Sequence, residues 1–286
     1  MRHPIPARSG VPKAGALAKS LLPQIIGHRG AAGNAPENTL ASLRKAKELG
    51  CSWVEFDVRL TADGHPVLLH DDRLKRTTYR RGKASELSLA EIRPCDAGAW
   101  FDVAFTGERV PTLEEAIMLV SELGFGANIE LKAERGRETV TGMVVADVLV
   151  RRWRSARSEL LISSFQQEAL AAARVRAPRI SRGILFRTIP KAWRSIAERL
   201  DCATINADHR RLNPILVSEV QGAGYPLLAY TVNDPARART LFDWGVTSVF
   251  SDVPRSLFCA AAGGRSRQPV VTNLDSTSVP RQRSVS

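Results

Sequence analysis

The sequence has little cysteine and no long apolar run. Its four cysteines are far apart among 286 residues, and they offer neither a C-x-x-C pair nor a zinc-binding spacing. We therefore expect reduced thiols, as is usual in a reducing compartment. No stretch approaches the ~18 apolar residues that suggest a membrane span, and the first residues lack the apolar segment of a secretory signal. These absences predict a cytoplasmic protein without an integral membrane segment.

Acidic residues are the minority among the charged side chains. The sequence has 41 Lys and Arg against 29 Asp and Glu, which gives a net charge of +12 and a pI near 10.2. A basic field can steer an anionic substrate, and it can also accompany nucleic-acid binding. The charge is dispersed, and no zinc finger, RNA-binding aromatic motif or basic zipper accompanies it. We therefore expect mostly solvated surface charge and no specific nucleic-acid partner.

Short apolar runs alternate with amphipathic segments from residue 24 onward. Eight strand–helix units in about 240 residues are typical of an α/β protein with a closed (β/α)8 TIM barrel. A doubly wound open sheet is the alternative, but no G-x-G-x-x-G motif follows the first predicted strand. The predicted strands cover residues 24–27, 52–60, 125–131, 160–164, 180–186, 203–206, 226–231 and 248–251.

Other segments complete the predicted organisation. A T-A-D-G turn after the second strand, followed by an apolar run at residues 66–70, predicts a hairpin. Residues 72–111 lack the strand–helix rhythm, and we interpret them as an insertion between barrel elements. Asn38 is predicted to cap the first barrel helix, and Thr112 with Glu115 the helix after the insertion. The expected parts are a flexible segment at residues 1–22, the barrel at residues 23–262 and a disordered, basic, Ser- and Arg-rich tail at residues 263–286.

Acidic and histidine side chains stand at the ends of predicted strands, where α/β barrels have their active sites. His28 follows the first strand, and His70 ends the hairpin. Glu55 and Asp57 are two residues apart on the second strand, so both point to one face, and Glu130 ends the next barrel strand. Unpaired acids in apolar strands would cost several kcal/mol. These carboxylates therefore need a divalent cation or a network among themselves.

The two histidines add acid–base chemistry to this set. Histidine titrates near neutral pH, so a pair beside a metal suits a general acid and a general base. A lone histidine at a strand end is more often a structural or surface residue. The combination with three acids favours a site that breaks a P–O bond.

A set of short motifs occurs in order over residues 24–258. They are HRG at 28–30, PENT at 36–39, EFDV at 55–58, TADG at 61–64, HD at 70–71, PTL at 111–113, NIELK at 128–132, YTVN at 230–233 and SDVP at 251–254. Each is weak alone, but the ordered set is specific and spans nearly the whole predicted barrel. With these motifs the chain resembles the glycerophosphodiester phosphodiesterase family, of the bacterial cytoplasmic type.

The resemblance implies a reaction, a fold and a set of roles. The fold is a (β/α)8 barrel with a small insertion after the second strand region. The reaction is hydrolysis of a glycerophosphodiester, such as glycerophosphocholine or glycerophosphoethanolamine, to sn-glycerol 3-phosphate and an alcohol, with Mg²⁺ or Ca²⁺ as the cofactor. The implied roles are His28 and His70 as the acid–base pair, Glu55, Asp57 and Glu130 as metal ligands, and Arg29, Lys132 and Trp244 as substrate-binding residues.

A few positions depart from the family's usual pattern. Tyr230 stands where a Trp is frequent, and Phe250 and Ser251 precede the last Asp where a Thr is frequent. Because these positions belong to the substrate rim, they bear on the head-group preference and not on the chemistry. Asn206 and His209 resemble a family segment near the glycerol pocket.

Two other functions are open at this point. A lysophospholipase D uses a similar barrel and motif set on lysolipids, and Trp100 and Phe101 in the predicted insertion are compatible with it. A catalytically silent, phosphate-binding barrel is the other alternative, and the intact acid and histidine set argues against it. The expected partner is a small-molecule phosphodiester. The sequence leaves open a homodimer, the preferred cation, the assignment of acid and base, and water or the glycerol 2-hydroxyl as nucleophile.

Overall fold

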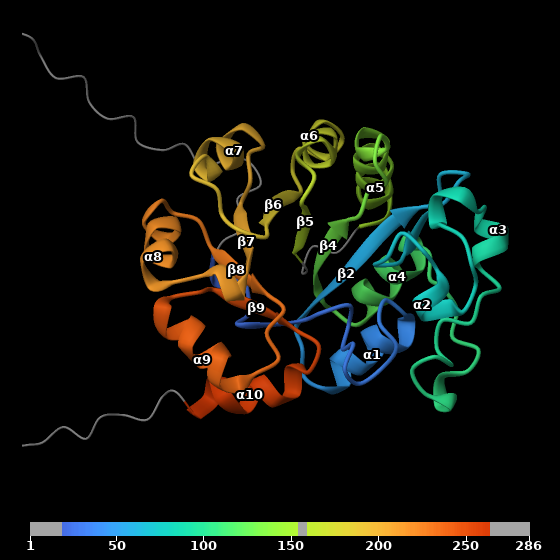
Figure 1. The fold of residues 1–286 in the computed structure, drawn as a ribbon, viewed down its shortest axis with the longest axis horizontal. Helices are drawn as coiled ribbons and strands as arrows, with labels where there is room; N and C mark the ends of the chain where they lie inside the picture. The colour runs from blue at the N-terminus through green and yellow to red at the C-terminus, as the bar shows by residue number, and fades with distance from the viewer. Residues whose placement is uncertain (1–18, 154–158, 264–286) are drawn as a thin grey trace, which may run out of the picture.

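A ring of parallel strands forms the centre of the structure, a computed structural model that describes residues 19–153 and 159–263 (Figure 1). Strand β1 pairs in parallel with β9 on one side and with β2 on the other, which closes the ring. Strand β3 (Pro66–Leu68) forms an antiparallel hairpin with β2. In ring order the barrel strands are β1 (Ile25–Gly27), β9 (Ser248–Ser251), β8 (Leu227–Tyr230), β7 (Thr204–Asp208), β6 (Ser181–Phe186), β5 (Leu160–Ser164), β4 (Gly126–Leu131) and β2 (Trp53–Leu60). The predicted (β/α)8 barrel is therefore confirmed.

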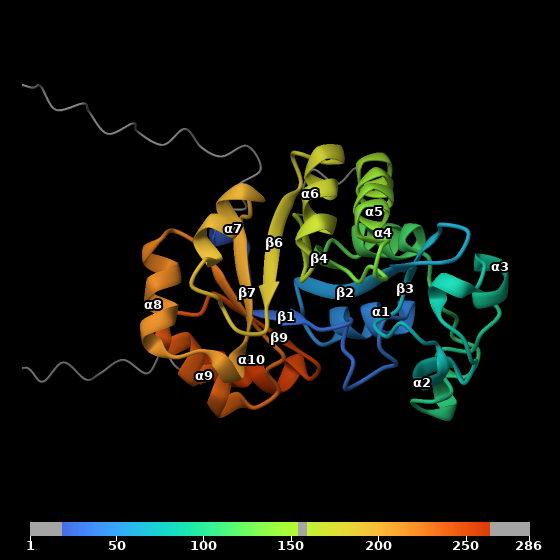
Figure 2. The same cartoon turned by 45° about the horizontal axis from the view of Figure 1, so that its top comes forward.

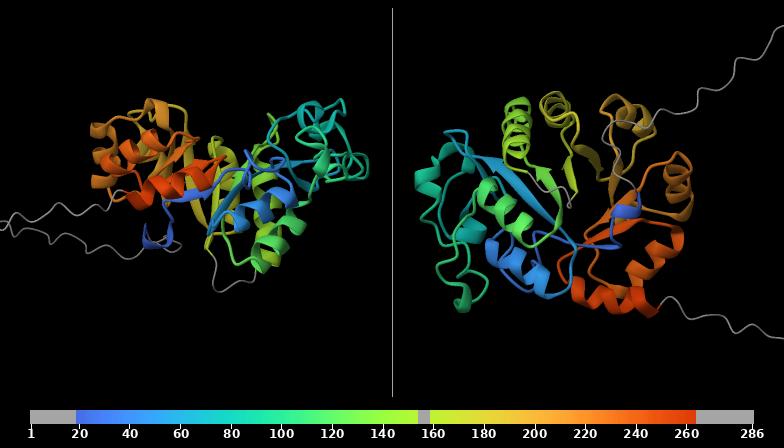
Figure 3. Two further views of the ribbon diagram at one scale, coloured as in Figure 1. Left: turned by 90° about the horizontal axis from the view of Figure 1, so that it is seen from below. Right: turned by 180° about the vertical axis from the view of Figure 1, so that it is seen from behind.

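Helices connect successive barrel strands and cover the outside of the ring, as the view from behind shows (Figure 3). The strands are buried along nearly their whole length, because helices cover one face and the barrel interior is filled on the other. The barrel helices are α1 (Leu40–Glu48), α4 (Leu113–Glu122), α5 (Glu138–Arg152), α6 (Gln167–Arg176), α7 (Trp193–Arg199), α8 (Pro214–Gly222), α9 (Pro235–Trp244) and α10 (Pro254–Gly263).

Side-chain alternation along β2 decides what faces the barrel interior. Val54 and Phe56 belong to the large apolar cluster between the strands and the helices. Trp53 belongs to a second, small cluster that plugs the barrel below the site. Residues two apart share a face, so Glu55 and Asp57 follow Trp53 on the interior side, toward the carboxyl end of the strand. The plug consists of Leu22, Ile26, Trp53, Leu161, Leu228 and Phe250.

The residues between β3 and α4 form an insertion that lies beside the β2–β3 hairpin (Figure 2). Its elements are α2 (Lys75–Thr78), η2 (Ala84–Glu86), α3 (Leu89–Ile92) and η3 (Val103–Phe105). Its apolar side chains form a cluster of their own, which consists of Val67, Leu69, Leu74, Ala84, Ile92, Ala97 and Val110. Arg93 binds Glu115 at 2.7 Å and so ties the insertion to the first turn of α4. Thr112 and Glu115 form the predicted capping box there.

Two local predictions are wrong. Asn38 does not cap α1: Thr39 does, since its hydroxyl accepts a hydrogen bond from the Ser42 backbone N–H at 3.1 Å. Asn38 instead adopts a left-handed backbone (φ +57°) that turns its side chain away from the helix. The hairpin strand ends at residue 68, before His70, because the chain turns there into the insertion.

No helix in the described ranges is both long and apolar enough to cross a membrane. The predicted flexible segment, except for residues 19–22, and the predicted tail beyond residue 263 lie outside the described residues.

Candidate active site

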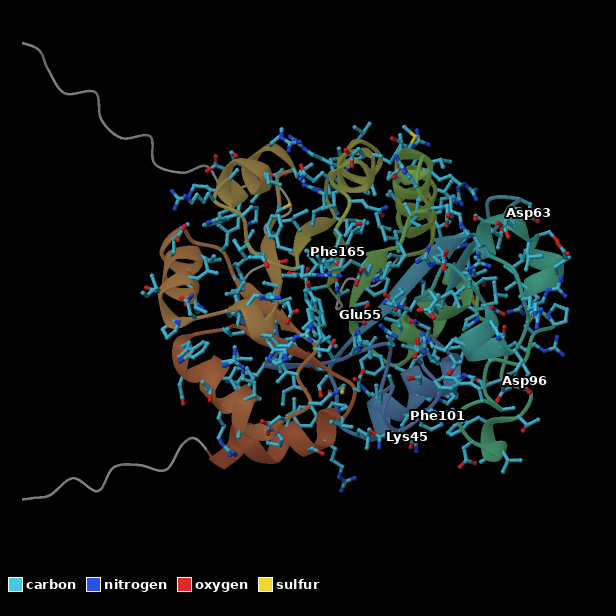
Figure 4. All side chains as sticks on the ribbon, viewed as in Figure 1. Lys45, Glu55, Asp63, Asp96, Phe101 and Phe165 are labelled. Carbon is cyan, nitrogen blue, oxygen red and sulfur yellow. The ribbon has the colours of Figure 1, made fainter. Side chains whose placement is uncertain are left out.

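Three carboxylates from two neighbouring strands converge inside the barrel. The parallel register of β2 and β4 places Glu55 beside Asn128 and Asp57 beside Glu130. One oxygen from each of Glu55, Asp57 and Glu130 lies within 4.8 Å of the others, and all three residues are buried. Figure 4 shows Glu55 near the centre of the barrel. The i and i+2 spacing and the register of the adjacent strand thus bring the three acids into one cluster.

Two cations partly balance this acidic cluster. The Lys132 Nζ atom lies 3.4 Å from Asp57 Oδ1 and 2.5 Å from Glu130 Oε1, and Arg29 Nε lies 3.3 Å from Asp57 Oδ2. Burial opposes ionisation of Asp57, but Lys132 and Arg29 hold the pKa of its carboxyl well below the usual range. Burial together with the Asp57 charge raises the pKa of Glu55 to about 8. Burial also raises the pKa of Glu130 despite the contact with Lys132.

The cluster fits a divalent cation. Glu55 Oε1 and Asn128 Oδ1 are buried oxygens that have no hydrogen-bond donor among the described residues. A buried acceptor without a partner costs stability, so such atoms generally mark a place for a ligand or an ion. Several carboxylate and amide oxygens facing one point are the ligand set of Mg²⁺ or Ca²⁺.

His28 follows β1 and is oriented by a residue from the neighbouring strand end. Its Nδ1 lies 2.6 Å from Asp252 Oδ1, and Asn233 in turn donates to Asp252 Oδ2 at 2.7 Å. The carboxylate holds a proton on Nδ1, so Nε2 faces the site, 3.8 Å from Glu55 Oε2. Burial lowers the pKa of His28, but the hydrogen bond to Asp252 and the charge of Glu55 outweigh burial and raise it.

His70 stands across the site and is oriented in the same way. Its Nδ1 lies 2.7 Å from Asp71 Oδ1, and Arg76 of α2 donates to Asp71 Oδ2 at 2.6 Å. Arg76 also donates twice to Glu37 at 2.7 Å, and Glu37 accepts a further bond from Arg29 at 2.7 Å. Burial lowers the pKa of His70. The insertion therefore reaches both the second histidine and the loop after β1 through one arginine.

The loop after β1 is held in left-handed backbone conformations that aim groups at the acids. Arg29 has φ +49°, and its backbone N–H donates to Glu55 Oε2 at 2.9 Å. Gly30 has φ +86°, and a Cβ there would lie 2.4 Å from a side chain of α1. Asn38 donates from Nδ2 to Asp57 Oδ2 at 2.9 Å and accepts from the Asp57 backbone N–H at 3.0 Å. The sequence reasoning missed this role of Asn38; its place in the PENT motif was the available signal.

These groups open into one pocket of about 270 Å³ at the carboxyl ends of the strands. Its polar floor includes both histidines and the side chains of Glu55, Asn128 and Glu130, and Phe165 and Tyr230 lie on its rim. The labelled Phe165 lies on this rim near the barrel centre (Figure 4), and its ring meets Tyr230 edge to face at 5.8 Å. The lining residues are His28, Arg29, Glu55, His70, Asn128, Glu130, Lys132, Phe165, Leu185, Arg187, Tyr230, Thr231 and Phe250.

Three residues named from the sequence lie elsewhere. Trp244 is the last residue of α9 and packs against the apolar cluster between strands and helices, with the Arg237 guanidinium 4.7 Å from its ring centre. Trp244 is not among the residues that line this pocket, and its contact with substrate stays a prediction. Asn206 is buried in β7 and accepts a hydrogen bond from Thr204. His209 contacts Arg237 outside the pocket.

A closed parallel barrel with acids, histidines and cations at the carboxyl ends of its strands defines an α/β-barrel enzyme. The model of the Glycerophosphoryl diester phosphodiesterase family matches residues 28–256. The chain belongs to this family of hydrolases.

Known relatives agree with this assignment. The chain is 32% identical to the glycerophosphodiester phosphodiesterase of Caldanaerobacter subterraneus subsp. tengcongensis over 82% of this chain and 95% of that protein. It is 31% identical to that of Bacillus subtilis over 80% of this chain and 83% of that protein. It is also similar to the structure of a phosphodiesterase from Oleispira antarctica in complex with the product sn-glycerol-3-phosphate. The TM-score is 0.83 and the sequence identity 43%, and the match covers 85% of this chain and 98% of that chain.

Proposed function

We propose that this protein hydrolyses glycerophosphodiesters to sn-glycerol 3-phosphate and an alcohol, and that it needs a divalent cation. The observation that carries the proposal is the convergence of three buried carboxylates within 4.8 Å, next to two histidines that each have their own aspartate. The product in the Oleispira antarctica structure supports the same substrate class.

The cation would be Mg²⁺ or Ca²⁺, held by Glu55, Asp57 and Glu130. When bound, it supplies neutralisation of negative charge on the phosphoryl oxygens. Arg29 and Lys132 lie beside the same acids and face the pocket, so their positive charges hold the phosphate against the floor.

The two histidines carry the proton transfers. One accepts a proton from the nucleophile, which is water or the glycerol 2-hydroxyl, and the other gives a proton to the leaving alcohol oxygen. Asp252 and Asp71 fix the ring orientation of His28 and His70, so each Nε2 is directed into the pocket. The breaking P–O bond and both proton sites then lie in one enclosed volume.

Glycerophosphocholine and glycerophosphoethanolamine are the first substrates to test. The assay measures released glycerol 3-phosphate with Mg²⁺, with Ca²⁺ and with excess chelator. We expect release that depends on the cation, and its loss in His28→Ala and His70→Ala proteins that remain folded. Equal release in chelator would contradict the metal requirement, and normal turnover in either histidine variant would contradict the mechanism.

Lysolipids belong in the same assay as the competing substrate class. The aromatic residues that suggested a lipid-binding insertion pack on one another, since the Trp100 and Phe101 rings meet at 5.7 Å, and neither is among the residues that line the pocket around Glu55. We therefore expect the glycerophosphodiesters to be preferred. A cytoplasmic location and a homodimer stay predictions.

A further inference from the structure

A second hollow of about 610 Å³ opens beside the catalytic pocket. It shares Phe165, Arg187 and Tyr230 with the catalytic pocket. It is also lined by Asp208, Arg210 and Arg211, which follow or end β7. A diester whose phosphate lies on the acidic floor can therefore extend its leaving alcohol across the shared rim into this hollow.

The hollow carries an excess of positive charge. Arg210 binds Asp208 with two hydrogen bonds, at 3.0 and 2.7 Å, so the carboxylate is already neutralised. Arg187 and Arg211 are exposed, and in the ranges that the structure describes neither has a carboxylate within ion-pair distance. Guanidinium groups without a carboxylate partner are suited to phosphate or carboxylate groups of a ligand.

A cation already lies beside the aromatic rim. The Phe165 and Tyr230 rings meet edge to face at 5.8 Å on this rim. The Lys132 ammonium already lies 5.7 Å from the centre of the Phe165 ring. A quaternary ammonium on the leaving group would therefore meet Lys132 and the arginines at close range, with like-charge repulsion.

We propose that this hollow is a leaving-group subsite that selects glycerophosphodiesters whose alcohol carries an additional anionic group. This inference rests on the proposed function, because it places the scissile phosphate on the acidic cluster. Arg187 and Arg211 bind the additional anion, and the reaction at the phosphodiester is unchanged. The released alcohol leaves with its own phosphate or carboxylate intact.

Two matched substrate pairs test the proposal. Glycerophosphoinositol 4-phosphate differs from glycerophosphoinositol by one phosphate, and glycerophosphoserine differs from glycerophosphoethanolamine by one carboxylate. With the full chain, a fixed cation and near-physiological salt, we expect the anionic member to have the higher kcat/KM, by about tenfold for the phosphate pair, as for charge-assisted hydrogen bonds. Comparison of the two pairs separates phosphate from carboxylate as the preferred group.

Substitutions then locate the effect. Arg187→Gln and Arg211→Gln should each lower the anionic-to-neutral ratio about fivefold or more, mainly through KM, as expected for a lost charge-assisted contact. Arg44→Gln removes the same charge from an exposed position on α1 and should leave the ratio unchanged. An equal fall in all three variants would show long-range steering and overturn the subsite.

The other outcomes are also decisive. A wild-type ratio of one or less for both pairs overturns the subsite while leaving glycerophosphodiester hydrolysis intact. Absence of glycerol 3-phosphate from every one of the four diesters would instead refute the proposed function itself.

Discussion

Asn38 and Asp57 hold each other through two hydrogen bonds, one to the Asp57 side chain at 2.9 Å and one from its backbone N–H at 3.0 Å. The carboxylate is fully buried, and this amide fixes its orientation together with Arg29 and Lys132. The pair links the loop after β1 to the acidic cluster on β2.

Replacing Asn38 with Ala should therefore weaken cation binding. We expect about a 10- to 100-fold loss of affinity for Mg²⁺ or Ca²⁺, as is usual when a group that orients a metal ligand is removed. Calorimetric titration of the metal-free protein measures this directly. Asn34→Ala, an exposed asparagine in the same loop, should bind the cation like wild type; equal losses in the two variants would contradict the role.

The part of the site that lies on strands could be predicted from the sequence. A two-residue spacing fixes the face of Glu55 and Asp57, and parallel strands align their carboxyl ends, so Glu130 had to lie near them. Strand positions were predicted well for the same reason: β5 and β9 have the predicted bounds.

The part of the site that depends on loop conformation and tertiary contact could not be predicted. Asn38 and Thr39 are adjacent residues that both suit a helix cap, and only the left-handed backbone at Asn38 assigns the cap to Thr39. Asp252 orients His28 across 224 residues of sequence, a contact that closing the barrel creates.

Asp252→Asn should reduce turnover and shift its pH dependence. Asp252 raises the pKa of His28, so loss of this charge lowers that pKa, and the limb of the pH–rate profile that belongs to His28 moves to lower pH. We expect kcat to fall about a hundredfold or more, the usual size of an acid–base contribution. The limb that moves identifies the role: the rising limb marks His28 as the base, and the falling limb marks it as the acid.

Asp243→Asn is the matched control for this experiment, because Asp243 is an exposed acid on α9. It should leave both kcat and the pH profile unchanged. A normal pH profile in Asp252→Asn would show that this carboxylate does not set the protonation of His28.

Glu55→Gln should not lower the thermal stability of the cation-free protein, although it removes a proposed ligand of the cation. A carboxyl whose pKa rises from 4.5 to about 8 on folding costs stability above its ordinary pKa, and the cost grows until about pH 8. In chelator at pH 8, the variant should therefore unfold at a temperature equal to or a few degrees above that of wild type, and the difference should shrink toward pH 5. Differential scanning calorimetry measures both values, with the exposed Glu48→Gln as the neutral control.

Addition of the cation should make wild type unfold at a higher temperature than Glu55→Gln. A ligand at about 100 times its Kd stabilises the folded state by about 2.7 kcal/mol, which corresponds to roughly 5–10 °C in a domain of this size. Wild type should show this rise and Glu55→Gln little of it. A rise of the same size in both proteins would mean that the cation binds elsewhere.

Arg76 connects the insertion to both sides of the site, because it binds Asp71 beside His70 and Glu37 beside Arg29. Burial works against ionisation of Asp71, but the bonds from Arg76 and His70 lower its pKa to about 2. Arg76→Gln should therefore reduce kcat/KM about 10- to 100-fold, because both His70 and Arg29 lose a group that orients them. Arg76→Lys should recover only part of this loss, since a lysine cannot form the paired contacts.

Arg80→Gln is the matched control, because it removes an equal charge from an exposed pair with Glu91 in the same insertion. It should stay within about twofold of the wild-type kcat/KM, as surface ion pairs contribute little. Equal behaviour of Arg76→Gln and Arg80→Gln would mean that the insertion does not act on catalysis through this residue.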